Sequence, residues 1–245
     1  MENNDVLEML EITKEFPGVK ALDSVTLKVK EGTVHSLMGE NGAGKSTLMK
    51  CLFGIYALDS GKILFRGEEV RFKNPKEALE NGISMIHQEL SPVPFRNIID
   101  NIWLGRFKTK RLLGIKVVDE KYLYGETEKL LKKLQLDISP KTEMKDLSVS
   151  QMQMVEIAKA ISSNAKVIVM DEPTSSLTEN EVEKLFEIIK QLKAEGVSVI
   201  YISHKMEEIL KISDEVSIMR DGKYIGTWAA KELTTDLIIS KMVGR

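Results

Sequence analysis

The spacing of hydrophobic and polar residues along the chain predicts two kinds of β-strand. Residues 25–30 alternate apolar and polar side chains, as a strand with one face in water does. Residues 167–170 are a continuous apolar run and residues 197–203 are mostly apolar, and both segments are typical of strands buried on both faces. Because both kinds of strand occur, the sequence predicts a mixed sheet.

Other segments repeat apolar residues at helical spacing. The expected helices are residues 45–53, 75–80, 121–134, 151–161, 179–193 and 205–212. Asp221 and Gly222, between two short strand-like runs, predict a hairpin turn at Arg220–Lys223. Strand signals are few between residues 91 and 145, so we expect a helical subdomain of about residues 91–160, inserted in the α/β core of a single domain, 1–245.

Composition narrows the class of protein. The chain has 245 residues, and its 35 Lys and Arg against 37 Asp and Glu give a formal charge of −2, which argues against a nucleic-acid partner. Cys51 is the single cysteine, so no internal disulfide can form, and a small buried side chain in a reducing cytoplasm is expected. The first ten residues lack the basic and apolar regions of a secretion signal, and no apolar run approaches the roughly 20 residues that span a bilayer. We therefore expect any membrane role to come through a partner.

One glycine-rich stretch has the spacing of a phosphate-binding loop. Gly39 is followed after four residues by Gly44, Lys45 and Ser46, between a short apolar strand and a helix. Backbone N–H groups of such a loop surround phosphate oxygens, the lysine reaches the β and γ phosphates, and the serine hydroxyl binds Mg²⁺. The predicted ATP-phosphate residues are Gly39, Glu40, Asn41, Gly42, Ala43, Gly44, Lys45, Ser46 and Thr47. The alternative is a glycine-rich turn without a ligand.

Two carboxylates follow the apolar strand 167–170. Asp171 and Glu172 stand at its carboxyl end, where open α/β sheets hold their ligands. We predict that Asp171 binds Mg²⁺, through water, and that Glu172 accepts a proton from the water that attacks the γ phosphate. A helix-capping turn is the alternative for these two residues.

Three further side chains are candidates. His204 ends the strand 197–203 and could hydrogen-bond the γ phosphate, although a surface histidine is the alternative. Gln88 closes another strand and could contact Mg²⁺ or water. Phe16 precedes a strand and could stack on adenine, or it could be a core residue. We expect His35 and His87 to be structural.

Leu147–Ala160 begins with a group of polar residues and continues as an apolar-periodic helix. Ser148 followed by Gln151 is typical of an ordinary helix N-cap. The helix start, with its N–H groups and positive dipole end, is also suited to an anion. Both interpretations stay open at this level.

Taken in order, these motifs resemble the nucleotide-binding domain of ABC transporters, and the resemblance covers essentially the whole chain. More narrowly they resemble the first half of bacterial sugar-import ATPases of the galactose/methylgalactoside type. The motifs that carry the resemblance are "GENGAGKST", Gln88, "LSVSQ", "VIVMDEP", "SSLT", "ISH" and the final "MVGR". The absence of an Asn-Lys-x-Asp stretch agrees with ATP rather than GTP.

The resemblance implies an ABC ATPase fold with an N-terminal antiparallel β region and a helical subdomain. It also implies that Ser148, Val149, Ser150 and Gln151 cap the γ phosphate of ATP held by a second domain. The family sequence there is Leu-Ser-Gly-Gly-Gln, so Val149 and Ser150 replace two glycines. Thr178 stands where the family usually has aspartate, and it also predicts a capping box with Glu181 at the start of the next helix.

The resemblance further implies an ATP hydrolase that uses Mg²⁺ at the cytoplasmic face of the membrane. Its partners would be transmembrane permease subunits, a second nucleotide-binding domain, either a second copy or a fused second half, and indirectly an extracellular sugar-binding protein. The alternatives are a non-transport ABC ATPase and a nucleotide sensor that binds without hydrolysis. Residues 91–106 contain Phe95 and Trp103 among several apolar side chains, and they would form either the subdomain core or a groove for a permease helix.

Overall fold

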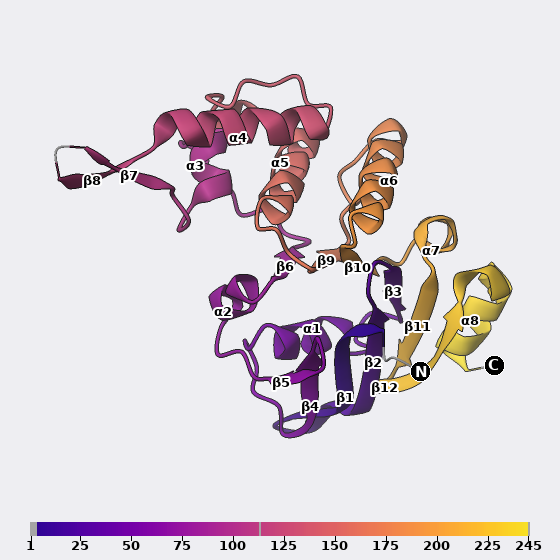
Figure 1. Ribbon diagram of the computed structural model, residues 1–245. Coiled ribbons are helices and arrows are strands. Elements are labelled where there is room, and N and C mark those ends of the chain that lie inside the picture. The colour runs from indigo at the N-terminus through magenta and orange to yellow at the C-terminus, as the bar shows by residue number, and fades with distance from the viewer. Residues whose placement is uncertain (1–3, 113, 245) are drawn as a thin grey trace. The chain divides into compact units, whose positions relative to one another are not determined.

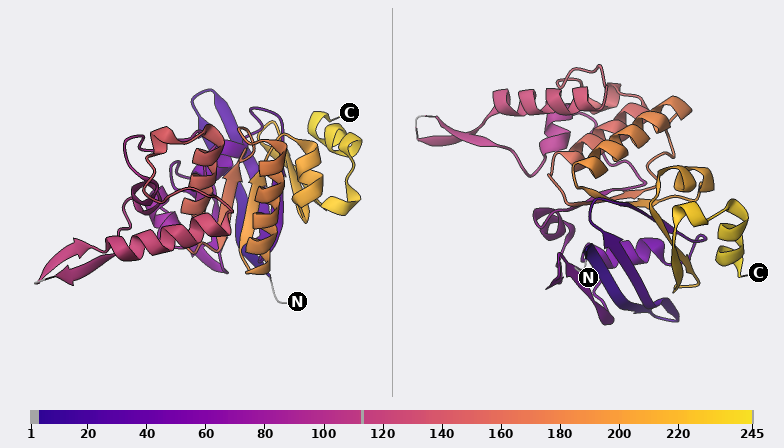
Figure 2. Two further views of the ribbon diagram at one scale, coloured as in Figure 1. Left: turned by 90° about the horizontal axis from the view of Figure 1, so that it is seen from above. Right: turned by 45° about the vertical axis from the view of Figure 1, so that its right-hand side comes forward.

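Figures 1 and 2 show the computed structural model, which describes residues 4–112 and 114–244. The chain divides into two compact units. The first unit runs to Met85 and also contains Ala165–Glu172 and the chain from Ile189 onward, whereas the second contains Ile86–Asn164 and Pro173–Ile188. Because the first unit is made of three separate segments, residues far apart in the sequence meet in it.

The first unit contains a four-stranded antiparallel sheet in the order β2-β1-β4-β5. Its strands are β1 Asp5–Phe16, β2 Val19–Lys30, β4 Ser60–Phe65 and β5 Glu68–Val70. In β2, Val25, Leu27 and Val29 are buried while the intervening Lys28 is exposed. The predicted strand with one wet face is therefore confirmed, and it is longer than the alternating segment.

The other large sheet has six strands in the order β12-β11-β3-β10-β9-β6. Its strands are β3 Val34–Met38, β6 Ile83–Ile86, β9 Val167–Asp171, β10 Ser198–Ile202, β11 Glu215–Arg220 and β12 Lys223–Ala229. Strand β3 pairs in parallel with β10 and β11, β10 pairs in parallel with β9, and β12 is antiparallel to β11. The mixed sheet is confirmed, and the carboxyl ends of β3, β9 and β10 meet at one edge.

All six expected helices are present within about two residues of their predicted bounds. The helices are α1 Lys45–Leu52, α2 Pro75–Glu80, α3 Ile98–Trp103, α4 Glu120–Lys133, α5 Val149–Ile161, α6 Glu179–Ala194, α7 Met206–Ile212 and α8 Thr235–Val243. Cys51 is buried in α1, and burial raises the pKa of its thiol to about 11, as suits a structural cysteine. Among the described residues, no helix is long and apolar enough to cross a bilayer.

The second unit consists mainly of α3, α4 and α5. Its buried side chains include Ile98 and Ile102 of α3 and Leu123 of α4, and the indole N–H of Trp103 donates to Thr127 at 2.9 Å. The expected helical character of residues 91–145 is wrong in one place, because β7 Thr109–Leu112 and β8 Ile115–Val118 form a hairpin. The hairpin lacks the alternating buried positions from which strands are predicted, since its side chains are almost all exposed.

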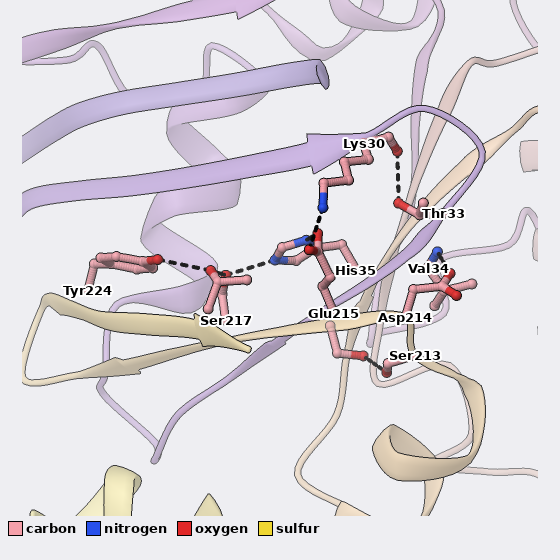
Figure 3. Close-up of polar contacts among 11 residues, drawn as sticks. Lys30, Thr33, Val34, His35, Ser213, Asp214, Glu215, Ser217 and Tyr224 are labelled. Carbon is pink, nitrogen blue, oxygen red and sulfur yellow. Dashed lines mark hydrogen bonds and ion pairs between the residues drawn. The ribbon is translucent and has the colours of Figure 1, made fainter. Parts of the chain in front are cut away.

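A polar cluster joins β2, β3, β11 and β12 in the first unit (Figure 3). His35 is fully buried, and its Nε2 lies 2.7 Å from the hydroxyl of Ser217. That hydroxyl lies 2.6 Å from Thr227, to which Tyr224 donates at 3.0 Å. The remaining ring nitrogen of His35 has no hydrogen-bond partner among the described residues, and it lies 3.9 Å from Glu215. The cluster supports the structural role expected of His35.

We expect the free energy of unfolding to depend on pH through His35. Burial lowers the pKa of His35 to about 4 in the folded protein, from 6.5 in the unfolded chain, despite the opposing charge of Glu215. The stability that the neutral ring contributes is present above pH 6.5 and is lost as the pH falls toward 4, because the unfolded chain binds the proton first. Urea unfolding at pH 7.5 and pH 4.5 is expected to reveal a loss of about 2–3 kcal/mol from this group.

The matched control is His35→Gln, which keeps a polar side chain of similar reach without a titrating ring. The carboxylates titrate in both proteins, so the difference between the two pH dependences isolates the histidine. Identical pH dependence in the wild-type and variant proteins contradicts the assignment.

Candidate functional site

The glycine-rich loop lies between β3 and α1, as the sequence predicts. All five residues of β3 are buried, and the loop leads directly into α1 at Lys45. Gly44 is the N-cap of α1 with φ of 101° and makes no side-chain cap, so the first N–H groups of the helix have no side-chain acceptor at this position. This arrangement places several N–H donors and the positive end of the helix dipole around one loop.

The side chain of Lys45 folds back over the loop. Its Nζ donates to the carbonyl oxygens of Gly39 at 2.7 Å and Glu40 at 3.1 Å. Burial lowers the pKa of Lys45, and the charges of Glu172 and Asp171 oppose that effect. The two carboxylates that follow β9 therefore act electrostatically on the lysine of the loop, and the structure brings these three predicted residues together.

Asp171 and Glu172 lie where β9 ends beside β10. Asp171 is the last residue of β9 and pairs with Ile202 in the parallel register, and the N–H of Glu172 donates to the Ile202 carbonyl at 2.9 Å. Glu172 has φ of 49°, which is uncommon for a residue other than glycine. Such a backbone conformation turns the chain out of the strand at once, and residues held this way cluster at functional sites.

Glu172 and His204 form a contact at this edge of the sheet. Nδ1 of His204 lies 2.9 Å from Oε1 of Glu172, and the ring nitrogen is the donor because a carboxylate only accepts. The side chain of Glu172 is only 12% exposed and that of His204 is 71% exposed. Oε2 of Glu172 is buried without a hydrogen-bond partner among the described residues. A mostly buried carboxylate with one oxygen held by a hydrogen bond and the other unpartnered is suited to accept a proton.

Mg²⁺ fits the donor chemistry at this edge. Ser46 in the first turn of α1 and Asp171 offer a hydroxyl and a carboxylate, which are the oxygen ligands that Mg²⁺ prefers. Within the described ranges, no group of three or more His, Cys, Asp and Glu side chains could hold a metal.

Phe16 lies at the end of β1 and is partly buried. Its ring packs edge-on against Tyr56, with centroids 5.1 Å apart, and the ammonium of Lys14 lies 5.5 Å from its centroid. Lys50 of α1 lies 5.5 Å from the ring of Tyr56, so the aromatic pair adjoins the helix that follows the loop. Sequence analysis did not predict that Tyr56 packs against Phe16. The signal that could have indicated it is the position of an aromatic residue just beyond α1. The role of Phe16 toward adenine stays a prediction.

The predicted signature segment begins α5 in the second unit. Ser148 is the N-cap: its Oγ accepts from the N–H of Gln151 at 3.2 Å, and Oε1 of Gln151 accepts from the N–H of Ser148 at 2.9 Å. Val149 is 56% exposed, and the Ser150 hydroxyl lies 3.1 Å from that of Ser148. The ordinary N-cap interpretation is therefore confirmed. It leaves the second interpretation open, because the Ser148 hydroxyl that accepts one hydrogen bond still has a proton to donate.

Thr178 precedes α6, as predicted. The carboxylate of Glu181 accepts from the N–H of Thr178 at 2.9 Å and from its hydroxyl at 2.8 Å. These bonds, with a further one from Ser150, lower the pKa of Glu181. One half of the predicted capping box is thus present, and Glu181 links the starts of α5 and α6.

Gln88 and the apolar segment 91–106 also lie in the second unit. Gln88 is exposed in the segment after β6, beside the exposed His87, and its role toward Mg²⁺ stays a prediction. The apolar residues between 91 and 106 divide into two groups. Ile98 and Ile102 belong to the core, whereas Val93 and Phe95 are 41% and 76% exposed. The core interpretation is therefore confirmed for Ile98 and Ile102, and the groove for a permease helix stays a prediction.

The fold, the phosphate loop and the carboxylates beyond β9 define an ATP-binding cassette. Residues 22–175 match the ABC transporter family, and the chain belongs to that family. Among solved structures, it is similar to a nucleotide-free ATP-binding cassette from an ABC transporter, with TM-score 0.83 and 27% identity over 98% of this chain and 96% of that one. It is equally similar to the ADP conformation of an ATP-binding cassette of an ABC transporter, with TM-score 0.83 and 27% identity over 99% and 100% of the two chains.

The descriptions of close relatives specify the kind of ABC transporter more narrowly. The chain is 69% identical to a galactose/methyl galactoside import ATP-binding protein of Clostridium tetani, over 100% of this chain and 49% of that protein. It is 62% identical to the protein of the same description from Fusobacterium nucleatum, over 100% of this chain and 48% of that protein. The chain spans about half the length of the curated relatives it matches.

Proposed function

We propose that this chain binds ATP with Mg²⁺ and hydrolyses it to drive import of a sugar, galactose or a methyl galactoside, through a membrane permease. The observation that carries the proposal is Glu172, which is held by His204 through one oxygen and has its other oxygen buried and unpartnered near Lys45. The class of sugar rests on the relatives' descriptions, since a separate binding protein and the permease would select it.

In this proposal each residue has a separate task. The N–H groups of Gly39–Thr47 and the ammonium of Lys45 bind the phosphates, and Glu172 takes the proton of the attacking water. Ser46 and Asp171 would hold Mg²⁺, which would neutralise part of the phosphate charge. His204 fixes Glu172 through Nδ1. Within the part of the chain that the structure describes, its Nε2 has no protein partner, and in the doubly protonated ring this atom donates a hydrogen bond to the γ phosphate.

A second domain completes the site. The start of α5 in the facing domain presents the Ser148 hydroxyl and the N–H groups of residues 149–151 to the γ phosphate. Ser148 can cap its own helix and donate outward at the same time. The facing domain would be a second copy of this chain or a fused second half, and the assembly would lie at the cytoplasmic face of the membrane. Val93 and Phe95, exposed beside the α3 core, provide an apolar contact for the permease.

A mixing experiment tests the shared site. Lys45→Ala damages the phosphate loop and Ser148→Ala damages the helix start, so we expect each variant alone to hydrolyse ATP poorly. Equal mixtures are expected to recover about one quarter of wild-type phosphate release, because half of randomly paired dimers are mixed and each mixed dimer has one intact site.

The control is a mixture of Lys45→Ala with Lys45→Ala,Ser148→Ala, in which no dimer has an intact phosphate loop. Full activity of Ser148→Ala by itself, or no recovery on mixing, contradicts a site made of two chains. Because the Ser148 side chain also caps α5, circular dichroism should first establish that the variant is folded; the lost cap is expected to cost about 1 kcal/mol.

A further inference from the structure

The described side chains of the β7–β8 hairpin are almost all exposed, so its own unit covers little of this hairpin. Figures 1 and 2 show it extending away from α3 and α4, and it forms a separate two-stranded sheet that no other described strand joins. All four residues of β7 and three of the four residues of β8 are exposed. An isolated two-stranded hairpin is marginally stable in water, so its exposed apolar residues indicate a surface that becomes covered.

The cross-strand pairs separate apolar and basic side chains along the hairpin. Leu112 pairs with Ile115 next to the turn, and these side chains are 58% and 68% exposed. The adjacent pair is Arg111 with Lys116, two like charges opposite each other, an arrangement that destabilises an isolated hairpin. The apolar pair therefore lies at the tip, and the cationic pair lies immediately behind it.

The basic character of the hairpin contrasts with the whole chain. The sequence 107–118 has four basic residues and no acidic residue, whereas the chain has a net charge of −2. Lys110 forms an ion pair with Asp119 at the base, at 3.0 Å, and Lys108 also contributes to lowering the pKa of Asp119. Arg111 and Lys116, nearer the tip, have no ion pair with an acidic side chain among the described residues.

We propose that the β7–β8 hairpin docks on the surface of an anionic lipid bilayer. Leu112 and Ile115 enter the boundary between headgroups and acyl chains, and Arg111 and Lys116 remain among the headgroup phosphates. The closely spaced anionic headgroups remove the repulsion between the two cations, and the hydrocarbon boundary covers the aliphatic tip. Nucleic acid would satisfy only the charges, because its bases stack on aromatic rings and the described tip residues are aliphatic.

The contact is expected to be weak and to orient the protein at the membrane. Each basic side chain near an anionic bilayer increases partitioning by about fivefold, and it acts only within a Debye length of the surface. The interaction requires neither nucleotide nor permease. It therefore stands independently of the proposed transport function, and its failure leaves that proposal untouched.

Vesicle co-sedimentation of the purified chain tests the proposal without a permease. We expect binding to vesicles containing phosphatidylglycerol and little binding to pure phosphatidylcholine, with the binding weakened at high salt. Replacing both cations by acids, in Arg111→Glu with Lys116→Glu, is expected to lower binding at least tenfold. The reason is that each lost cation alone lowers partitioning by about fivefold. Leu112→Ser with Ile115→Ser should weaken binding to the same anionic vesicles without changing the charge.

The matched control is Lys62→Glu with Lys76→Glu, which makes the same change in net charge on exposed residues of β4 and α2. This control is expected to bind vesicles nearly as well as wild type. The proposal is overturned if the control loses as much binding as the hairpin variant, or if the protein binds phosphatidylcholine vesicles equally well. It is also overturned if an oligonucleotide binds the hairpin as tightly as anionic vesicles do and releases the protein from them. Phosphate release by the hairpin variants should match wild type, which shows that they are folded.

Discussion

Replacing Glu172 by glutamine is expected to lower ATP hydrolysis by about 10²- to 10⁴-fold while ATP binding persists. Glutamine has the shape of glutamate, so an amide oxygen can still accept from Nδ1 of His204 at the position of Oε1. Its NH₂ group then occupies the position of the buried, unpartnered Oε2, and it cannot accept a proton from water. The phosphate loop is unchanged, so the substitution separates binding from chemistry.

Three measurements distinguish these effects. Phosphate release reports the chemical step, and fluorescent-nucleotide titration reports binding. Sedimentation with ATP and Mg²⁺ is expected to show a dimer of the variant, because a site that binds ATP without hydrolysing it stays closed. Glu69→Gln on β5 is the matched control, since this exposed residue undergoes the same chemical change far from the loop in sequence. Near-normal hydrolysis by Glu172→Gln removes this residue from the role of base.

The local features of the site could be predicted because their causes are local. The glycine spacing of residues 39–44 predicts a loop between strand and helix, and β3 and α1 occupy the expected positions. Asp171 follows a continuous apolar run, and His204 follows a mostly apolar segment. Since buried parallel strands align their carboxyl ends, the proximity of the two chain segments follows from the fold class. The direct bond between His204 and Glu172 required the structure, because register and side-chain direction fix it.

Features that depend on other surfaces could not be predicted in the same way. The β7–β8 hairpin buries almost nothing in this chain, so its sequence carries no periodic pattern of burial. Ser148 has a complete local explanation as the N-cap of α5, and its proposed second role needs another domain. Phe95 is similarly exposed in this chain, and its proposed contact needs a partner. Prediction therefore succeeds where one chain supplies all the contacts and weakens where a partner supplies them.

Replacing Gly44 by alanine is expected to destabilise the first unit and to impair ATP binding together. Gly44 has φ of 101°, and a Cβ there would lie 2.8 Å from the carbonyl oxygen of Ala21 and 2.9 Å from Cδ2 of Leu22. The left-handed conformation alone costs a non-glycine residue about 1–2 kcal/mol, and the close contact with backbone adds to that cost. We expect the free energy of unfolding to fall by about 2–3 kcal/mol in urea titrations.

The control variant Gly67→Ala separates the cost of a left-handed backbone conformation from the cost of a close contact with the added Cβ. Gly67 has φ of 81° in the turn between β4 and β5, and no heavy atom of the described residues lies within 4 Å of the position that a Cβ would take there. We expect this control to lose only the conformational part of the stability and to bind ATP normally. In Gly44→Ala the backbone must shift away from Ala21, which moves N–H donors of the phosphate loop.

Losing one hydrogen bond to a charged phosphate costs about 1.5–3 kcal/mol, so the ATP affinity of Gly44→Ala should fall by about ten- to a hundredfold. Fluorescent-nucleotide titration of both glycine variants measures this difference. Equal stability losses in the two variants, with ATP affinity retained, would show that β2 yields to the added methyl group and does not hold the loop in place.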